Sequence, residues 1–213
     1  MLVLMKTFVP YTCSPRYFRS GGLSVVLFLA FSPPSVFAQS WTLPQKLDDS
    51  NTTVTFDLAT TWHRVEGKIS GISGSARFSD PADDKSLHAE IFFPVKNFDT
   101  GNRSRDKELR HDMAEPQHPN AKLEIVKSDQ LCPRTAVITG KPCRASLSAT
   151  LEIREQKQEI NLPITIQRTD RGFAAFGEIS FHWLDFGIED PSMIIARVDK
   201  TVNVHYRVEL PLE

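Results

Sequence analysis

Apolar and polar residues alternate along most of the chain beyond residue 50. A two-residue period places one face of a β-strand in an apolar interior and the other face in water. The positions assigned to the apolar face are Val54, Phe56 and Leu58; Leu87, Ala89, Ile91, Phe93 and Val95; Leu123 and Ile125; Leu147, Ala149, Leu151 and Ile153; Ile160, Leu162, Ile164 and Ile166; Phe173, Ala175, Gly177, Ile179, Phe181 and Trp183; and Val202, Val204, Tyr206, Val208 and Leu210. The pattern therefore predicts an all-β domain.

Turn signals separate these stretches. Residues 70–74 hold two Ser-Gly pairs, residues 80–84 combine proline with three aspartates, and residues 170–172 read Asp-Arg-Gly. Because such connections are short, most neighbouring strands are expected to be antiparallel. About eight strands are expected in one domain. Strands this long and amphipathic call for a sandwich or a closed barrel, and the alternation alone does not choose between them.

Residues 97–120 break the alternation and predict one short helical segment. Asn102 or Ser104 can cap such a helix at its N-terminus. Leu109 and Met113, four residues apart, would give the helix an apolar edge. Two prolines further on are expected to end it.

The N-terminal residues 1–38 predict a secretory signal peptide. They contain three basic residues and no acidic one, then an apolar run at residues 23–31, then small residues at the −3 and −1 positions of a cleavage site after Ala38. The nine-residue run is shorter than the roughly 20 residues needed to span a bilayer. Residues 39–213 are then the mature domain, and an uncleaved membrane anchor is the alternative.

Charge and hydropathy narrow the partners of the mature chain. The full sequence has 25 Lys and Arg against 26 Asp and Glu, a net charge of −1, and loss of the three basic residues of the leader leaves −4. A balance of this kind lacks the basic footprint of a nucleic-acid-binding protein. No second long apolar run follows Ala38, so no transmembrane segment is expected in the mature chain.

Two cysteines remain after cleavage, Cys132 and Cys143. In an oxidising compartment they can form one structural disulfide, worth about 2–3 kcal/mol for a loop this short. A redox-active pair is the alternative, but the Cys-x-x-Cys spacing typical of such pairs is absent.

The sequence holds none of the common catalytic motifs. It has no Gly-x-Ser-x-Gly, His-Glu-x-x-His, Walker or Gly-x-Gly-x-x-Gly segment. Among six histidines only His111 and His118 lie close together, and they lack a convincing set of supporting ligands. We therefore expect no enzyme activity, no metal site and no cofactor.

Several segments, in order, resemble the YceI-like periplasmic proteins. Residues 98–106, Phe-Asp-Thr-Gly-Asn-Arg-Ser-Arg-Asp, are similar to the family's Thr-x-Asn-x-x-Arg-Asp segment. Residues 148–154 with 160–163 resemble its Gly-x-Leu-Thr-Ile-x-Gly strand pair, and residues 185–188 match its Asp-Phe-Gly-Ile element. The resemblance implies a lipocalin-like barrel, here of eight antiparallel strands, located in the periplasm and binding a long isoprenoid lipid.

A barrel of this size either fills its interior with side chains or holds a ligand. The small inward residues Ala89, Ala149, Ala175 and Gly177 favour a cavity, although close strand packing would also explain them. The residues predicted to contact the lipid tail are Phe56, Ile91, Phe93, Ala149, Ala175 and Phe181.

Arg103 and Arg105 are the candidates for a polar head. A guanidinium can hold a phosphate through two hydrogen bonds, and a helix N-terminus beside it would add a positive end. In the alternative interpretation, Arg105 and Asp106 pair and fix the shape of the loop, or face water.

Three functions are compatible with the sequence. The first is periplasmic binding, transport or storage of a long apolar lipid inside the barrel. The second is a non-catalytic, stress-related interaction protein with a filled barrel, which an exposed patch around Phe92 and Phe176 would favour. These two residues fall on the outward face and also suggest burial against the helix or in a homodimer. The third is an enzyme acting on lipids, which requires titratable groups that converge in a pocket.

Overall fold

The structure is a computed structural model that describes residues 43–44, 46–80, 83, 85–130, 141–190, 192 and 197–211. The segment 1–38 and Cys132 lie outside the described residues, so the signal peptide and the disulfide stay predictions. None of the helices within these ranges has the length and hydrophobicity that crossing a bilayer requires.

The described residues form one antiparallel sheet with the strand order β1-β4-β5-β7-β8-β9-β10-β11-β2-β3-β6. The strands are β1 (Leu47–Asp48), β2 (Thr52–Ala59), β3 (Arg64–Ile69), β4 (Ser73–Phe78), β5 (Leu87–Pro94), β6 (Phe98–Asp99), β7 (Asn120–Gln130), β8 (Cys143–Ile153), β9 (Gln156–Thr169), β10 (Gly172–His182) and β11 (Thr201–Leu210). The predicted all-β, antiparallel architecture is confirmed.

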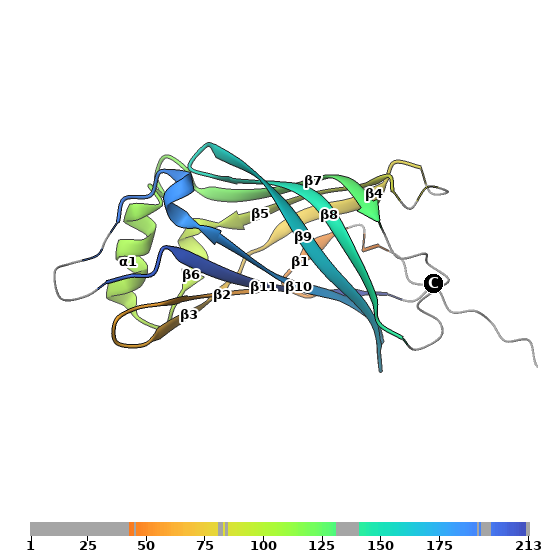
Figure 1. The fold of residues 1–213 in the computed structure, drawn as a ribbon, viewed down its shortest axis with the longest axis horizontal. Helices are drawn as coiled ribbons and strands as arrows, with labels where there is room; N and C mark the ends of the chain where they lie inside the picture. The colour runs from red at the N-terminus through yellow and green to blue at the C-terminus, as the bar shows by residue number, and fades with distance from the viewer. Residues whose placement is uncertain are drawn as a thin grey trace, which may run out of the picture. The chain divides into compact units, whose positions relative to one another are not determined.

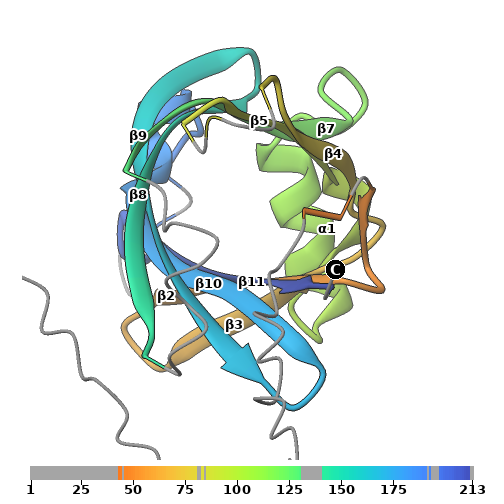
Figure 2. The same cartoon turned by 90° about the vertical axis from the view of Figure 1, so that its right-hand side faces the viewer.

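The sheet curls until its two ends meet at the turn between β3 and β4. β1 pairs with the start of β4, and β6 pairs with the end of β3. The Asp49 carboxylate accepts hydrogen bonds from the backbone N–H groups of Gly71 and Ile72, at 2.7 and 2.8 Å. In Figure 2 the strands accordingly form a ring, so the fold is a barrel rather than a sandwich.

The expected number of about eight strands was too low. Besides the two-residue edge strands, nine strands of six or more residues are present in the described chain, and the additional ones include β3 and β4. The inward positions of these two strands include Gly67, Gly74 and Ala76, which weaken the apolar alternation. Ser73 and Gly74, interpreted as a turn from the sequence, begin β4.

The helix α1 (Arg103–Asp112) follows a short 3-10 helix, η1 (Val95–Asn97), and β6. Its N-cap is Asn102, whose side-chain oxygen accepts from the backbone N–H groups of Ser104 and Arg105. The cap satisfies donors that the first turn leaves unpaired. Met113 is buried and Leu109 packs against the core, so the predicted apolar edge is confirmed. α1 lies at one end of the barrel (Figure 1).

The barrel wall is uneven between β9 and β10, a place that we call the β9/β10 seam. The two strands pair only from Gly172 with Thr169 to Phe176 with Thr165. Beyond these pairs β9 continues along β8, and β10 continues along β11. Pro163, at this point of β9, has no N–H group to donate to a neighbouring strand.

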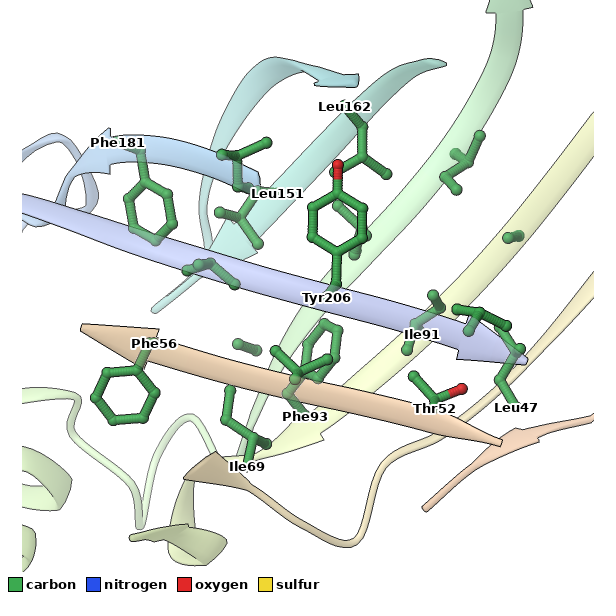
Figure 3. A pocket seen from close by; sticks show the side chains of 18 of the residues that line it. Leu47, Thr52, Phe56, Ile69, Ile91, Phe93, Leu151, Leu162, Phe181 and Tyr206 are labelled. Carbon is green, nitrogen blue, oxygen red and sulfur yellow. The ribbon is translucent and has the colours of Figure 1, made fainter. Parts of the chain in front are cut away.

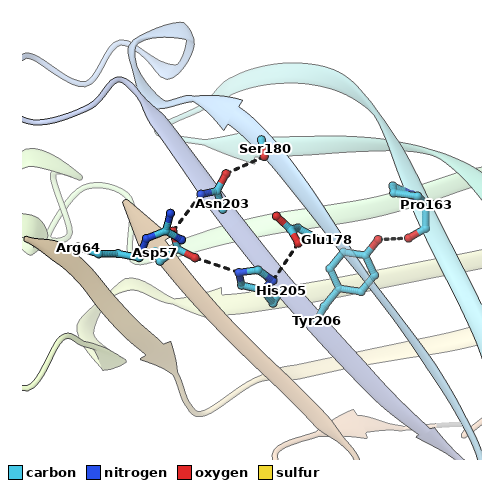
Figure 4. A network of polar contacts seen from close by, with 8 residues as sticks. All are labelled: Asp57, Arg64, Pro163, Glu178, Ser180, Asn203, His205 and Tyr206. Atoms are coloured by element: carbon cyan, nitrogen blue, oxygen red, sulfur yellow. Dashed lines mark hydrogen bonds and ion pairs between the residues drawn. The ribbon is translucent and has the colours of Figure 1, made fainter. Parts of the chain in front are cut away.

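Side chains, rather than a hydrogen-bonded ladder, close the seam. The Tyr206 side chain of β11 passes over Gly177 of β10. Its hydroxyl donates to the Pro163 carbonyl of β9 (Figure 4). Farther along, the 3-10 helix η3 (Trp183–Phe186) covers β9, with Gln158 Nε2 donating to the Asp185 carbonyl at 3.1 Å.

Candidate functional site

The barrel encloses one large apolar cavity. It offers about 290 Å³ to the centres of water-sized molecules, whereas a single water needs roughly 10–15 Å³ by the same measure. Side chains from β2, β5, β8, β9, β10 and β11 point into it (Figure 3). The residues labelled there are Leu47, Thr52, Phe56, Ile69, Ile91, Phe93, Leu151, Leu162, Phe181 and Tyr206.

Few polar atoms face this space. Among the described residues that line the cavity, only Thr52, Asp112, Trp183 and Tyr206 carry a side-chain nitrogen or oxygen. Thr52 Oγ1 donates to Asn51 Oδ1 at 2.9 Å, and Trp183 Nε1 donates to a backbone carbonyl at 2.8 Å. The Tyr206 hydroxyl donates to the Pro163 carbonyl. Three of the four polar side chains therefore already donate a hydrogen bond to the protein itself. Such a lining suits a hydrocarbon chain.

The structure brings together five of the six residues predicted to contact a lipid tail. Phe56, Ile91, Phe93, Ala175 and Phe181 all line the cavity. The sixth, Ala149, is buried in β8 but does not contribute to the lining. Their contact with a ligand stays a prediction.

Neither Arg103 nor Arg105 is among the residues that line the cavity. Arg103 is exposed at the start of α1. Arg105 donates from Nε to Thr100 Oγ1 at 2.8 Å and from Nη2 to the Thr100 carbonyl at 2.9 Å. Asp106 accepts from the backbone and hydroxyl of the same threonine. Both charged residues therefore shape the loop through Thr100, as in the alternative interpretation, without pairing directly.

The sequence interpretation missed several lining residues, and two groups of them have a clear reason. Ile69, Ala76 and Phe98 belong to the strands that were overlooked or too short to recognise. Asp112 lines the cavity from α1, three residues after Leu109. Its position could have been predicted from its spacing of three residues from Leu109, because residues i and i+3 share a helix face.

A polar network lies on the outer face of the barrel (Figure 4). The buried carboxylate of Asp57 in β2 accepts from Arg64 Nη1 at 2.8 Å and from Asn203 Nδ2 at 2.9 Å, and contacts His205 Nε2 at 2.9 Å. Burial raises the pKa of Asp57, but the hydrogen bonds from Asn203 and His205 and the Arg64 charge outweigh it and hold that pKa below its usual value. The network thus ties β2 to β3 and β11.

Replacing Asp57 by asparagine is expected to destabilise the barrel by about 1–3 kcal/mol at pH 7, since hydrogen bonds to a charged acceptor are lost. The lower half of that range is favoured because the Arg64 and His205 side chains are 59% and 44% exposed. Because the folded-state pKa of Asp57 is lowered, its contribution is complete above the unfolded value of about 3.9 and disappears as the pH falls through the folded value.

Urea unfolding of wild type and Asp57→Asn at pH 7 and near pH 3 measures this effect. The stability difference should narrow at the lower pH, and Asp170→Asn, on an exposed turn, should change stability little at either pH. An Asp57→Asn difference that is the same at both pH values would contradict the assignment.

A family model described as a YceI-like domain matches residues 45–210. Among curated proteins, none matches this sequence. BcnA of Burkholderia cenocepacia superposes with a TM-score of 0.60 at 16% identity, over 74% of this chain and 94% of that one. A polyisoprenoid binding domain of Saccharophagus degradans gives 0.59 at 16% identity, over 82% and 99%.

A third solved structure, a YCEI protein of Campylobacter jejuni, gives a TM-score of 0.51 at 16% identity, over 70% of this chain and 84% of that one. At such identities the structural likeness shows the fold alone.

Proposed function

The chain belongs to the YceI-like family, and from this premise we propose that it binds a long apolar lipid, a polyisoprenoid or a similar chain, inside its barrel. The observation that carries the proposal is the cavity, which is lined almost throughout by hydrocarbon side chains. The Saccharophagus degradans neighbour is a polyisoprenoid binding domain, which supports the ligand class.

The energetics of the cavity favour capture of a long chain. Each buried methylene contributes about 0.8 kcal/mol, so a tail of a few dozen carbons has more transfer energy than binding can realise. Net affinity saturates near 18–21 kcal/mol, since ordering a flexible chain costs entropy. Binding should therefore be tight and discriminate poorly between chain lengths.

We further propose that the protein works in the periplasm, where it carries or stores the lipid, and that it does so without catalysis. The predicted leader at residues 1–38 supports export. The absence of the common catalytic motifs from the sequence supports a binding role.

The stress-related interaction protein with a filled barrel gains no support from the described residues. Its interior would be packed with side chains, whereas a cavity is present. The outward-facing Phe92 and Phe176 are half-buried, with Lys122 Nζ 5.8 Å and the Arg207 guanidinium 5.9 Å from the respective ring centres.

Native mass spectrometry of the protein purified from an exporting host tests the proposal. We expect the mass of residues 39–213 plus a stoichiometric lipid, which organic extraction then identifies as a prenyl or acyl chain. A mass that begins at residue 1 would contradict cleavage after Ala38. An unliganded mass that incubation with prenyl lipids does not change would contradict the binding function, and the same spectra report whether the protein is a dimer.

A further inference from the structure

Asp112 places a carboxyl group at one end of the cavity. It is the last residue of α1 and lines the cavity together with Leu109 of the same helix and the C-cap residue Met113. α1 lies at the end of the barrel where β8 ends at Ile153 and where Ile188 follows η3, and both of these residues also line the cavity.

This carboxyl group differs from the other polar groups of the lining. Thr52, Trp183 and Tyr206 each donate to a protein acceptor. No described residue donates a hydrogen bond to Asp112. A carboxylate can accept several hydrogen bonds, so its acceptor capacity remains available to a ligand.

The surroundings of Asp112 are partly apolar and mixed in charge. Burial raises the pKa of the Asp112 carboxyl, and the negative charges of Glu108 and Glu189 raise it further. His111 and Arg154 lower this pKa, but the net shift is upward. Arg154 already donates to the Gly187 carbonyl. Of these charged groups, only Asp112 lines the cavity.

The opposite end of the cavity offers hydrocarbon. Leu47, Leu87 and Leu210 line it there, and all three are buried. Thr52 lies at the same end, but its hydroxyl donates to Asn51. Leu87 begins β5 and Leu210 ends β11, so both lie at the ends of their strands that point away from α1. An apolar tail therefore fits this end better than a polar head does.

We propose that Asp112 receives the polar head of the bound lipid, that the tail runs from α1 toward Leu47 and Leu210, and that the head is a hydrogen-bond donor, a hydroxyl or an amine. This inference rests on the proposed lipid-binding function and deepens it. A phosphate head would meet the negative charge of Asp112, the one charged group among the described residues that line the cavity, which disfavours an anion.

Four probes of equal chain length test the inference: a C20 prenyl alcohol, the corresponding amine, the corresponding monophosphate and the parent hydrocarbon. Wild-type protein should bind the alcohol or the amine about tenfold more tightly than the hydrocarbon, the ratio expected for one hydrogen bond to a charged acceptor. The monophosphate should bind no more tightly than the hydrocarbon.

Asp112→Leu should bind the hydrocarbon at least as well as wild type and lose the preference for the alcohol and the amine. Asp112→Asn keeps an acceptor oxygen but no charge, so it should retain part of the preference for the alcohol and lose that for the amine. Lys107→Leu, an apolar substitution on the exposed face of the same helix, should behave like wild type. Circular dichroism establishes that each variant is folded.

Two results would overturn the inference while leaving lipid binding intact. One is a wild-type preference for the monophosphate over the alcohol and the amine. The other is an unchanged preference for the alcohol in Asp112→Leu. If folded wild-type protein binds none of the four probes, the proposed function itself fails.

Discussion

Replacing Ala175 by tryptophan is expected to prevent capture of a long lipid while the barrel remains folded. Ala175 lies on the inner face of β10 and lines the cavity. An indole at this position would project into space that the ligand would occupy. Excluding only four methylene groups from burial costs about 3 kcal/mol, a loss of roughly a hundredfold in affinity.

The matched control is Ala59→Trp, the same substitution at an exposed position near the end of β2. It should bind lipid as wild type does. Titration of both variants with one fluorescent prenyl lipid, together with thermal unfolding, separates a blocked cavity from a damaged fold. If Ala175→Trp is folded and binds lipid with unchanged affinity, the ligand does not occupy this cavity.

Replacing Gly177 by alanine is expected to destabilise the protein by about 3 kcal/mol or more, the upper range for inserting a group into a packed site. A Cβ atom at this position would overlap the Pro163 carbonyl oxygen and the Tyr206 hydroxyl. The carbonyl belongs to the backbone of β9, so relief requires movement of a strand rather than of one side chain. Denaturant unfolding measures the change.

Glu178→Ala, at the next residue of β10, is the control for this prediction. Glu178 is exposed, and its one polar side-chain contact among the described residues is an exposed ion pair with His205 at 3.4 Å, so its loss should cost less than about 1 kcal/mol. Adding Tyr206→Phe to Gly177→Ala should restore only part of the stability, because the overlap with Pro163 remains. A Gly177→Ala protein as stable as wild type would contradict the described packing at the seam.

The inner faces of the long strands could be predicted because burial on one side imposes a two-residue period. Val54, Phe56, Ile91 and Ile166, for example, are all buried as expected. β3 escaped prediction because the ring of Phe56 covers Gly67, its partner across the strands. The aromatic side chain of Phe56 thus fills the space above Gly67, so the apolar residue appears in the sequence of β2 and not in that of β3.

The small inward residues had two different roles, which the sequence could not separate. Ala89 and Ala175 line the cavity and leave room in it. Gly177 instead admits the Tyr206 ring and the Pro163 carbonyl, from strands distant in the sequence.

The head-group candidates depended on local contacts that the sequence did not reveal. Arg105 is attractive as a free cation next to a helix N-terminus, but Thr100 occupies its donors. Asp112 was not recognised as a lining residue, although it shares a helix face with Leu109 and therefore reaches the cavity.

Because of the β9/β10 seam, the barrel wall resists separation of its strands unequally at different places. Parting β8 from β9 would disrupt a ladder that runs from Cys143 to Ile153. Beyond Phe176, β9 and β10 are no longer paired. Among the described contacts, their separation there would break the Tyr206–Pro163 hydrogen bond. It would also break the hydrogen bonds from Gln158 to the Asp185 carbonyl and from Arg154 to the Gly187 carbonyl. The resistance of the wall to lateral strain is therefore lower along this line than along the β8–β9 ladder, because fewer hydrogen bonds oppose separation there.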